Sequence, residues 1–271
     1  MPAITGPTVS PILDRTLARY GLATLLSWAT EAIVLGWSDD QILLELYERP
    51  EFNARFPAIK AREAAGYPPI NPEEYLQYED MMMGLSTMWG MGITKTQIDN
   101  MISNNVSPKE GEERVNLAAA AVFEDDSETR SEIQRMYGVG VGDLINYWMD
   151  PKRTMGVLQQ QYRSAQIAGT SLRAGYGQIS EQQAQRLLQT GMSREQSLTG
   201  FSQLVANEEL FKSSIETEAD ITRDQQVELL AGDTTLNKEL ESRASRRLAE
   251  YQGGGGFAAG QTGFAVGSAK D

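Results

Sequence analysis

The side chains that most often do chemistry in proteins are missing from this sequence. Its 271 residues include no histidine and no cysteine. Without histidine there is no Ser-His-Asp triad, no imidazole proton shuttle and no histidine-ligated zinc site. Without cysteine there is no thiolate nucleophile, no thiolate metal ligand and no disulfide. What remains is the chemistry of carboxylate pairs, of carboxylate-held metals, or of a Ser-Lys dyad, for which no local signature is present.

A carboxylate pair is the first candidate for catalysis. Glu73, Glu74, Glu79 and Asp80 are close in sequence, and Glu73 and Asp80 would share one face of a helix, two turns apart. Acidic residues are also common at the start of helices, because the positive end of the helix dipole favours them. We prefer this structural interpretation to a glycosidase-type pair, and we expect no enzymatic activity.

Three further segments contain residues that bind metals or phosphates in other proteins. The acidic pair 39–40 is explained by a helix start, and the acidic run 124–128 lacks the alternating ligands, central glycine and distal glutamate of a calcium loop. We expect a solvated turn there, with Asp126 or Ser127 as the next N-cap. The glycine-rich segment 138–142 lacks the Lys-Ser/Thr ending of a phosphate loop, so we expect a tight turn. The sequence predicts neither a cofactor nor a metal site.

The composition is that of a soluble globular protein. Apolar residues make up 41% of the chain, charged residues 23%, and the formal net charge is −13. This charge repels phosphate backbones, so we expect no sequence-specific nucleic-acid partner. The N-terminus lacks the pattern of a secretory signal. The longest apolar stretch, Tyr20–Trp37, is interrupted by Ser27, Thr30 and Glu31 and is too polar to span a bilayer at rest.

One helix start signal recurs along the chain. A Ser or Thr is followed three residues later by Gln, which is the pattern of a capping box. The boxes begin at Ser38, Thr94, Ser180, Ser193 and Thr222, and Ser107 with Glu110 is a close variant. No segment shows sustained strand alternation. The sequence therefore predicts an all-α fold.

The longest predicted helix covers residues 151–176, with Asp150 as N-cap and Pro151 at its first position. Apolar or small residues recur along it with alternating spacings of three and four, at Met155, Leu158, Tyr162, Ala165, Gly169, Leu172 and Tyr176. Gly169 leaves a shallow surface that another helix can approach closely. Two interpretations remain open. The seam is either the centre of this chain's own core or a packing axis for a partner subunit.

The predicted organisation is a body of about twelve mostly short helices around this long central helix, with extended ends. It comprises an N-terminal arm (1–10), an N-terminal helical region (11–123) that opens with a helix from Pro11 to Leu35, a C-terminal helical region (126–252) and a glycine-rich tail (253–271). The tail carries Phe257 and Phe264, which would anchor it on a neighbouring protein. Arg243, Arg246 and Arg247 form a basic patch before it.

Several stretches resemble a group of uncharacterised virion-associated proteins of tailed bacteriophages. They are Ala18–Leu22, Arg49–Phe52 with Arg55–Ala58, Glu74–Tyr75 with Tyr78–Glu79, Asp150–Pro151 followed by Gln166–Gly169, and Tyr251–Phe257. These are not active-site motifs. The resemblance implies a structural or assembly role in the virion, in the tail or among the internal proteins released at infection.

Three hypotheses follow. The first is a non-enzymatic virion protein, made in the host cytoplasm, that packs against other virion proteins and forms a homo-oligomer. Its partner-binding residues would be Met155, Tyr162, Gly169, Tyr176, Arg246, Arg247, Phe257 and Phe264. The alternative is a membrane-active protein of genome ejection, whose residues Tyr20–Trp37 form an amphipathic helix in the host membrane. The third is a carboxylate enzyme such as a wall hydrolase.

Overall fold

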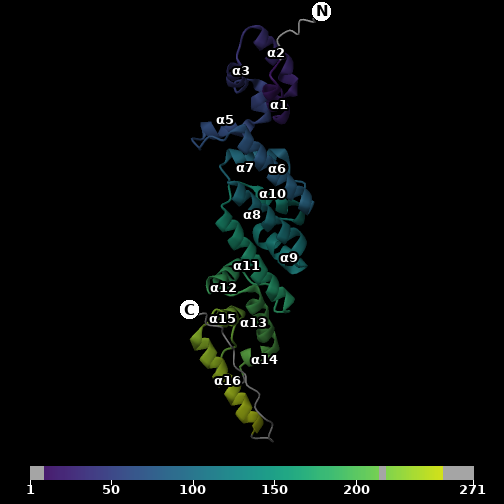
Figure 1. Cartoon of the computed structure of the whole chain (residues 1–271). Coiled ribbons are helices and arrows are strands. Elements are labelled where there is room, and N and C mark those ends of the chain that lie inside the picture. Colours follow the sequence, from purple (N-terminus) through teal and green to yellow (C-terminus); the bar gives the residue numbers. More distant parts are fainter. Residues whose placement is uncertain (1–8, 214–217, 253–271) are drawn as a thin grey trace, which may run out of the picture. The chain divides into compact units, whose positions relative to one another are not determined.

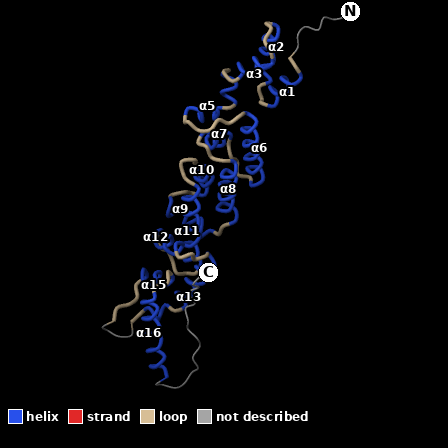
Figure 2. Tube along the Cα trace, turned by 60° about the vertical axis from the view of Figure 1, so that its left-hand side comes forward, coloured by secondary structure: helices blue, strands red, loops and turns tan. Residues whose placement is uncertain are grey.

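The computed structural model describes residues 9–213 and 218–252, and this part of the chain is built from helices, turns and loops (Figures 1 and 2). It contains sixteen α-helices, and no strand occurs within the described ranges. The predicted all-α fold is therefore confirmed. The helices are more numerous than the twelve expected, in part because the predicted helix from Pro11 to Leu35 is divided by a turn.

The helices form two compact units, each of which has its own core. The first unit comprises the described residues up to Ala119 and residues Ile145 to Met155. It contains α1 (Pro11–Arg19), α2 (Leu26–Val34), α3 (Asp39–Leu46), α4 (Pro50–Arg55), α5 (Pro57–Ala64), α6 (Pro72–Trp89), α7 (Lys95–Ser103), α8 (Pro108–Ala119) and all but the first residue of α10 (Leu144–Met149).

The second unit comprises residues 120–144 and the described residues from Gly156 onward. It contains α9 (Ser127–Tyr137), α11 (Met155–Arg173) apart from its first residue, α12 (Glu181–Gln189), α13 (Arg194–Ala206), α14 (Glu208–Phe211), α15 (Arg223–Leu230) and α16 (Thr234–Gln252). The sequence placed a single division between residues 123 and 126, whereas the two units are interleaved along the chain.

The recurring start signal produces the expected caps. The side chains of Ser38, Thr94, Ser180, Ser193 and Thr222 each accept a hydrogen bond from the backbone N–H of the Gln three residues on. Each Gln side chain accepts in return from the N–H of the cap residue. Asn71 and Glu74 make the same reciprocal pair before α6. Two otherwise unpaired donors are thus satisfied at each helix start.

The expected helix from Pro11 to Leu35 is wrong. Helix α1 ends at Arg19, Gly21 adopts a φ of +71°, and a 3-10 turn over Ala23–Leu25 precedes α2. The N–H of Leu22 donates to the carbonyl of Leu17 at 2.8 Å, which closes the end of α1 around the left-handed glycine. Residues Tyr20–Trp37 therefore do not form one continuous amphipathic helix. No helix in the described ranges is long and apolar enough to cross a bilayer.

The long helix α11 also begins later than expected, at Met155 rather than Pro151, and ends at Arg173. The carboxylate of Asp150 accepts a hydrogen bond from the N–H of Lys152 at 3.0 Å, and the carbonyl of Asp150 accepts from Arg153 at 3.2 Å. When an Asp side chain accepts a hydrogen bond from the backbone N–H two residues later, it forms a turn and does not cap a helix. Asp150 therefore closes a turn, and Pro151 lies within it.

The two cores differ in character. In the first unit, aromatic rings form a chain in which Phe56 contacts Tyr20, Phe52 and Tyr75 at centroid distances of 5.0 to 5.5 Å. The core of the second unit is mainly aliphatic and gathers side chains from α11, α12, α13, α15 and α16, with Phe201 and Phe211 buried among them. Each unit therefore buries enough apolar surface to stabilise helices that would be marginal alone.

Gly169 marks the closest approach between α11 and α9. A Cβ atom there would lie 2.7 Å from Oγ1 and 2.9 Å from the backbone nitrogen of Thr129. We expect Gly169→Ala to lower the free energy of unfolding by about 1–3 kcal/mol, because the two helices would have to separate. The measurement is chemical denaturation followed by circular dichroism.

Gly156 is the matched control in the same helix, because a Cβ added there meets nothing within 4 Å. Gly156→Ala should leave stability unchanged or raise it by up to about 1 kcal/mol. Equal stability changes in the two variants would show that Gly169 is not required for the close packing of α9 on α11.

Candidate interaction surfaces

The predicted seam on α11 is buried in its own chain. Leu158, Tyr162, Ala165 and Gly169 are all buried, and Ser164, Ile167 and Ala168 are buried beside them. Burial and the neighbouring carboxylate of Asp125 raise the pKa of the Tyr162 hydroxyl above its ordinary value. Of the two interpretations of the seam, the central core helix accounts for these residues. Met155, at the start of α11, is half-buried.

Tyr176 follows α11 and is also held by its own chain. Its ring packs against Phe201 at a centroid distance of 5.2 Å, and the guanidinium of Arg223 lies 4.5 Å from the ring centroid. Its hydroxyl donates to the carbonyl of Arg223 at 3.0 Å, and Arg223 in turn donates to the carbonyl of Tyr176. These contacts join the end of α11 to the start of α15.

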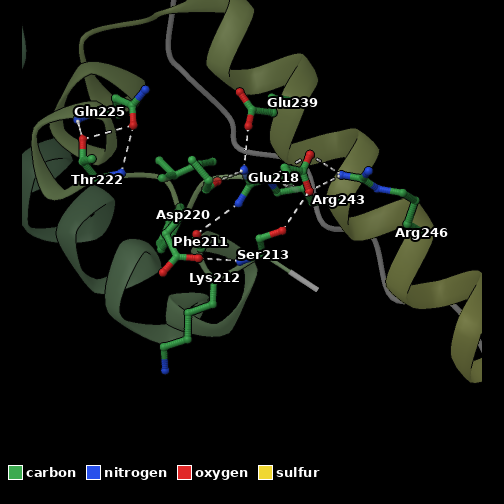
Figure 3. Close-up of polar contacts among 12 residues, drawn as sticks. Phe211, Lys212, Ser213, Glu218, Asp220, Thr222, Gln225, Glu239, Arg243 and Arg246 are labelled. Carbon is green, nitrogen blue, oxygen red and sulfur yellow. Dashed lines mark hydrogen bonds and ion pairs between the residues drawn. The ribbon is translucent and has the colours of Figure 1, made fainter. Parts of the chain in front are cut away.

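The basic residues of α16 bind a loop of the same unit (Figure 3). Arg246 donates to the carboxylate of Glu218 at 2.8 Å, and Arg247 donates to the carbonyl of Lys212 at 2.7 Å. The hydrogen bond from Arg246 is the main reason that the pKa of Glu218 lies below its ordinary value. Both arginines remain half-exposed. Phe257 and Phe264, the predicted anchors of the tail, lie outside the described residues.

Arg243, one turn before Arg246, is the buried centre of this contact. Its side chain is only 3% exposed. It donates to the carbonyl of Phe211 at 3.1 Å, to the carbonyl of Ala219 at 2.7 Å and to the carboxylate of Glu239 at 2.7 Å. The sequence showed Arg243 only as part of a basic patch. Its role depends on a loop far away in sequence, so no local signal could identify it.

Two arginines of the first unit act in the same way, and sequence reasoning missed both. Arg114 is 1% exposed and donates to the carbonyls of Trp148, Asp150 and Arg153 while it pairs with Glu110. Arg62 is also buried. It donates to the carbonyl of Pro68 after α5, to the carbonyl of Ile102 in the last turn of α7, and to the side chain of Asn105 just after α7. We name Arg62, Arg114 and Arg243 the arginine clamps.

The acidic run after α8 is not the solvated turn that the sequence predicts. Asp126 does cap α9, since it accepts from the N–H of Thr129 at 2.8 Å. Asp125, however, is buried, and Arg194 binds both carboxylates, Asp126 at 2.6 Å and Asp125 at 3.2 Å. Arg173 lies 3.2 Å from Asp126. Two guanidinium groups thus balance the two carboxylates, and the run joins α9, α11 and α13.

Three of the four carboxylates considered for catalysis have structural partners in the first unit, two in ion pairs and Glu74 in the capping box before α6. Glu73 pairs with Arg19 at 2.5 Å, and Glu79 pairs with Arg55 at 2.7 Å. In the described part of the chain, no group of three or more His, Cys, Asp or Glu side chains is arranged to hold a metal ion. These contacts favour the structural interpretation of the acidic residues on α6.

A recess of about 500 Å³ opens in the first unit beside α6. Ile70, Met81 and Val106 contribute apolar lining, together with Tyr78. The Tyr78 hydroxyl is buried without a hydrogen-bond partner, and it lies where a Cβ on Gly111 would be only 2.6 Å away. Burial raises the pKa of Tyr78 well above its ordinary value. Packing against α8 therefore holds this hydroxyl, and the recess offers mainly shape and apolar surface.

The helical hairpin α2–α3 leaves large apolar side chains exposed. Val34 is 64% exposed, Leu35 75% and Leu44 76%, and Trp37 between the helices is 38% exposed. We name these four residues the apolar tip. Helix α2 contains a single charged residue, yet only its two alanines, Ala29 and Ala32, are buried. Several large exposed apolar side chains within one short segment are typical of sites of protein association in soluble proteins.

Comparison with protein families, with curated proteins and with solved structures found no match to this chain.

The contribution of Arg243 to stability can be measured by comparison with Arg247, a nearby arginine on the same helix. We expect Arg243→Met, which keeps the aliphatic stem, to lower the free energy of unfolding by about 3 kcal/mol, because the carbonyls of Phe211 and Ala219 lose a charged donor and Glu239 loses its buried partner. Arg247→Met is the control, because Arg247 is half-exposed and makes one hydrogen bond to the backbone. Its cost should stay below about 1 kcal/mol. Urea denaturation of both variants provides the comparison, and equal losses would contradict the assignment.

Asp126 gives the structure a dependence on pH. Burial raises the pKa of its carboxyl group, but hydrogen bonds from Thr129 and Arg194 outweigh burial and hold the pKa below its ordinary value. The charged form therefore stabilises the folded chain above a pH of about 4, and this contribution is lost as the pH falls through the lowered pKa. Asp126→Asn should keep the N-cap and remove the charge.

We expect Asp126→Asn to be less stable than the unmodified chain at neutral pH, and the difference to shrink as the pH falls toward about 2. Urea denaturation at several pH values measures it. Asp80→Asn, at an exposed position, should show little difference at any pH. A stability difference for Asp126→Asn that stays constant with pH would rule out the ion pair as its source.

Proposed function

We propose that this chain is a non-enzymatic structural protein of a bacteriophage virion, which works by binding neighbouring virion proteins, including further copies of itself. The single observation that carries the proposal is the apolar tip, a large apolar surface that the first unit leaves exposed. The stretches that resemble virion-associated phage proteins support the same role. The virion is accordingly the proposed location of the protein.

The physical basis of this function is burial of apolar side chains between subunits. Each leucine or valine that becomes buried contributes roughly 1.5–3 kcal/mol before the costs of association. A few such anchors give modest affinity for one pair of subunits. Repetition around a symmetric particle would multiply that affinity, because neighbouring contacts then form at high effective concentration.

The glycine-rich segment 253–271 is the second proposed docking element. It lies outside the described residues, and the proposal rests on its sequence, in which Phe257 and Phe264 are the large apolar side chains among Gly, Ala and Gln. Aromatic side chains contribute much of the binding energy at protein interfaces. This element would bind an adjacent subunit.

Deletion of residues 253–271 should therefore weaken assembly and leave the helical body folded. The expected result is a smaller mass by light scattering at equal concentration, with unchanged helical signal in circular dichroism. A variant with Phe257→Ser and Phe264→Ser keeps the length and should reproduce the effect. Assembly of the truncated chain that equals that of the full chain would count against the proposal.

A membrane-active role in genome ejection is the second candidate, and the exposed Val34 and Leu35 at the end of α2 favour it. Two observations weigh against it. The segment Tyr20–Trp37 is divided by the turn at Gly21, and α2 has only nine residues. Leakage of anionic vesicles distinguishes the two candidates. Leakage caused by the full chain and absent from a Leu35→Ser, Leu44→Ser variant would support the membrane role over docking between virion proteins.

A further inference from the structure

The residues of the apolar tip come from one short segment of the chain, residues 34–44. Val34 ends α2 and Leu35 follows it, and Gly36, with a φ of +89°, turns the chain toward Trp37 and α3. Leu44 lies one helical turn beyond Asp40, on the same face of α3. The opposite face of α3 carries Ile42 and Leu46, which are buried. The tip is therefore the outward surface of a hairpin whose inner surface is already packed.

Carboxylates surround the tip. Glu31 is one helical turn before Leu35, Asp40 is one turn before Leu44, and Glu45 is next to Leu44. Glu31, Asp40 and Glu45 form no ion pair with any residue in the described ranges. From Tyr20 to Glu48 the sequence contains five carboxylates and no lysine or arginine. Of these carboxylates, Glu48 pairs with Lys60 at 3.1 Å, and the guanidinium of Arg49 lies 3.9 Å from the centroid of the Trp28 ring on α2. The segment thus combines exposed apolar side chains with three carboxylates, Glu31, Asp40 and Glu45, that have no ion pair in the described part of the chain.

We propose that the apolar tip binds a basic amphipathic helix of a protein other than this chain. This inference rests on the proposed function and names the chemistry of one partner. Apolar side chains along one stripe of such a helix would cover Leu35 and Leu44. Lysines and arginines at the edges of that stripe would pair with Glu31, Asp40 and Glu45. Removal of the tip from water supplies affinity, and the charges supply orientation and association rate.

The same charges argue against the other occupants of this surface. A second copy of the chain that met the tip with its own tip would place identical carboxylates against each other. An anionic membrane surface would repel the segment for the same reason, because attraction to such membranes requires lysine or arginine. A basic partner is the occupant whose charge complements the tip.

The experiment uses the full chain and a synthetic helical peptide of leucine and lysine, labelled for fluorescence anisotropy. A peptide of leucine and glutamate with the same pattern is the charge control. We expect the leucine-lysine peptide to bind, the leucine-glutamate peptide not to bind, and binding to weaken as salt is raised. Leu35→Ser with Leu44→Ser should weaken binding by about tenfold or more, because two apolar contacts are lost.

Matched variants separate the tip from general attraction to an acidic protein. Glu31→Gln, Asp40→Asn and Glu45→Gln together should weaken binding several-fold. Glu63→Gln, Asp80→Asn and Glu112→Gln together change the net charge equally at exposed positions outside the tip and should have little effect. Val205→Ser, at an exposed valine of the second unit, controls for loss of apolar surface.

Equal weakening by the two triple variants, or unchanged binding in the Leu35→Ser, Leu44→Ser variant, would overturn the proposal. It would also be overturned if that variant abolished self-association, since the occupant would then be a second copy. Tail-dependent assembly that survives in the variant, together with lost peptide binding, would support it. If deletion of residues 253–271 left assembly unchanged while the tip bound the peptide, only the tail-docking part of the proposed function would fail.

Discussion

The fold depends on satisfying the backbone groups at the ends of many short helices. Every α-helix leaves four N–H groups and four carbonyl groups without partners inside the helix. Sixteen helices in the described residues therefore create many such groups, and those that are buried cost free energy unless they are paired. The chain uses two devices. Capping boxes satisfy donors at helix starts, and the arginine clamps satisfy carbonyl acceptors at helix ends and in the loops that follow.

The clamps explain how loops without regular structure become part of a packed unit. Arg114 holds the residues around the end of α10. Arg62 holds the segment that follows α5 and the last turn of α7. Arg243 holds the end of α14 and the loop that follows it. A guanidinium group has five donors in a planar fork, so one buried side chain can hold several carbonyls at fixed positions. A lysine at the same position would supply a single ammonium group. The three clamps thus place positive charge inside the structure of an acidic chain, where it binds backbone carbonyls.

The apolar tip is where the architecture leaves burial incomplete. Tyr20, which follows α1, packs against Phe56 in the aromatic core, whereas Val34, Leu35 and Leu44 are exposed. Surface apolar residues scattered singly need no explanation, but several together beside unpaired carboxylates do. Binding to another protein would complete the burial and neutralise the charge at the same time, which is why this surface carries the functional proposal.

Some features of this protein were determined by the sequence alone. The all-α fold and the starts of helices at Ser38, Thr94, Ser180, Ser193 and Thr222 could be predicted, because a capping box is a contact between residues only three positions apart. The absence of histidine and cysteine likewise limits the available chemistry in any conformation. The exact limits of the helices were less predictable. At Gly21 the chain could continue a helix or end it, and at Asp150 the side chain could cap a helix or close a turn.

The tertiary structure decided the rest. The acceptors of the arginine clamps lie far along the chain, with separations of 40 residues from Arg62 to Ile102, 34 from Arg114 to Trp148 and 32 from Arg243 to Phe211. No local pattern reports such a pairing. The same holds for Gly169, whose close neighbour Thr129 belongs to another helix, and for Leu35 and Leu44, whose exposure follows from which face of each helix the core covers. Spacing along a helix shows which residues share a face, but only packing decides whether that face is buried.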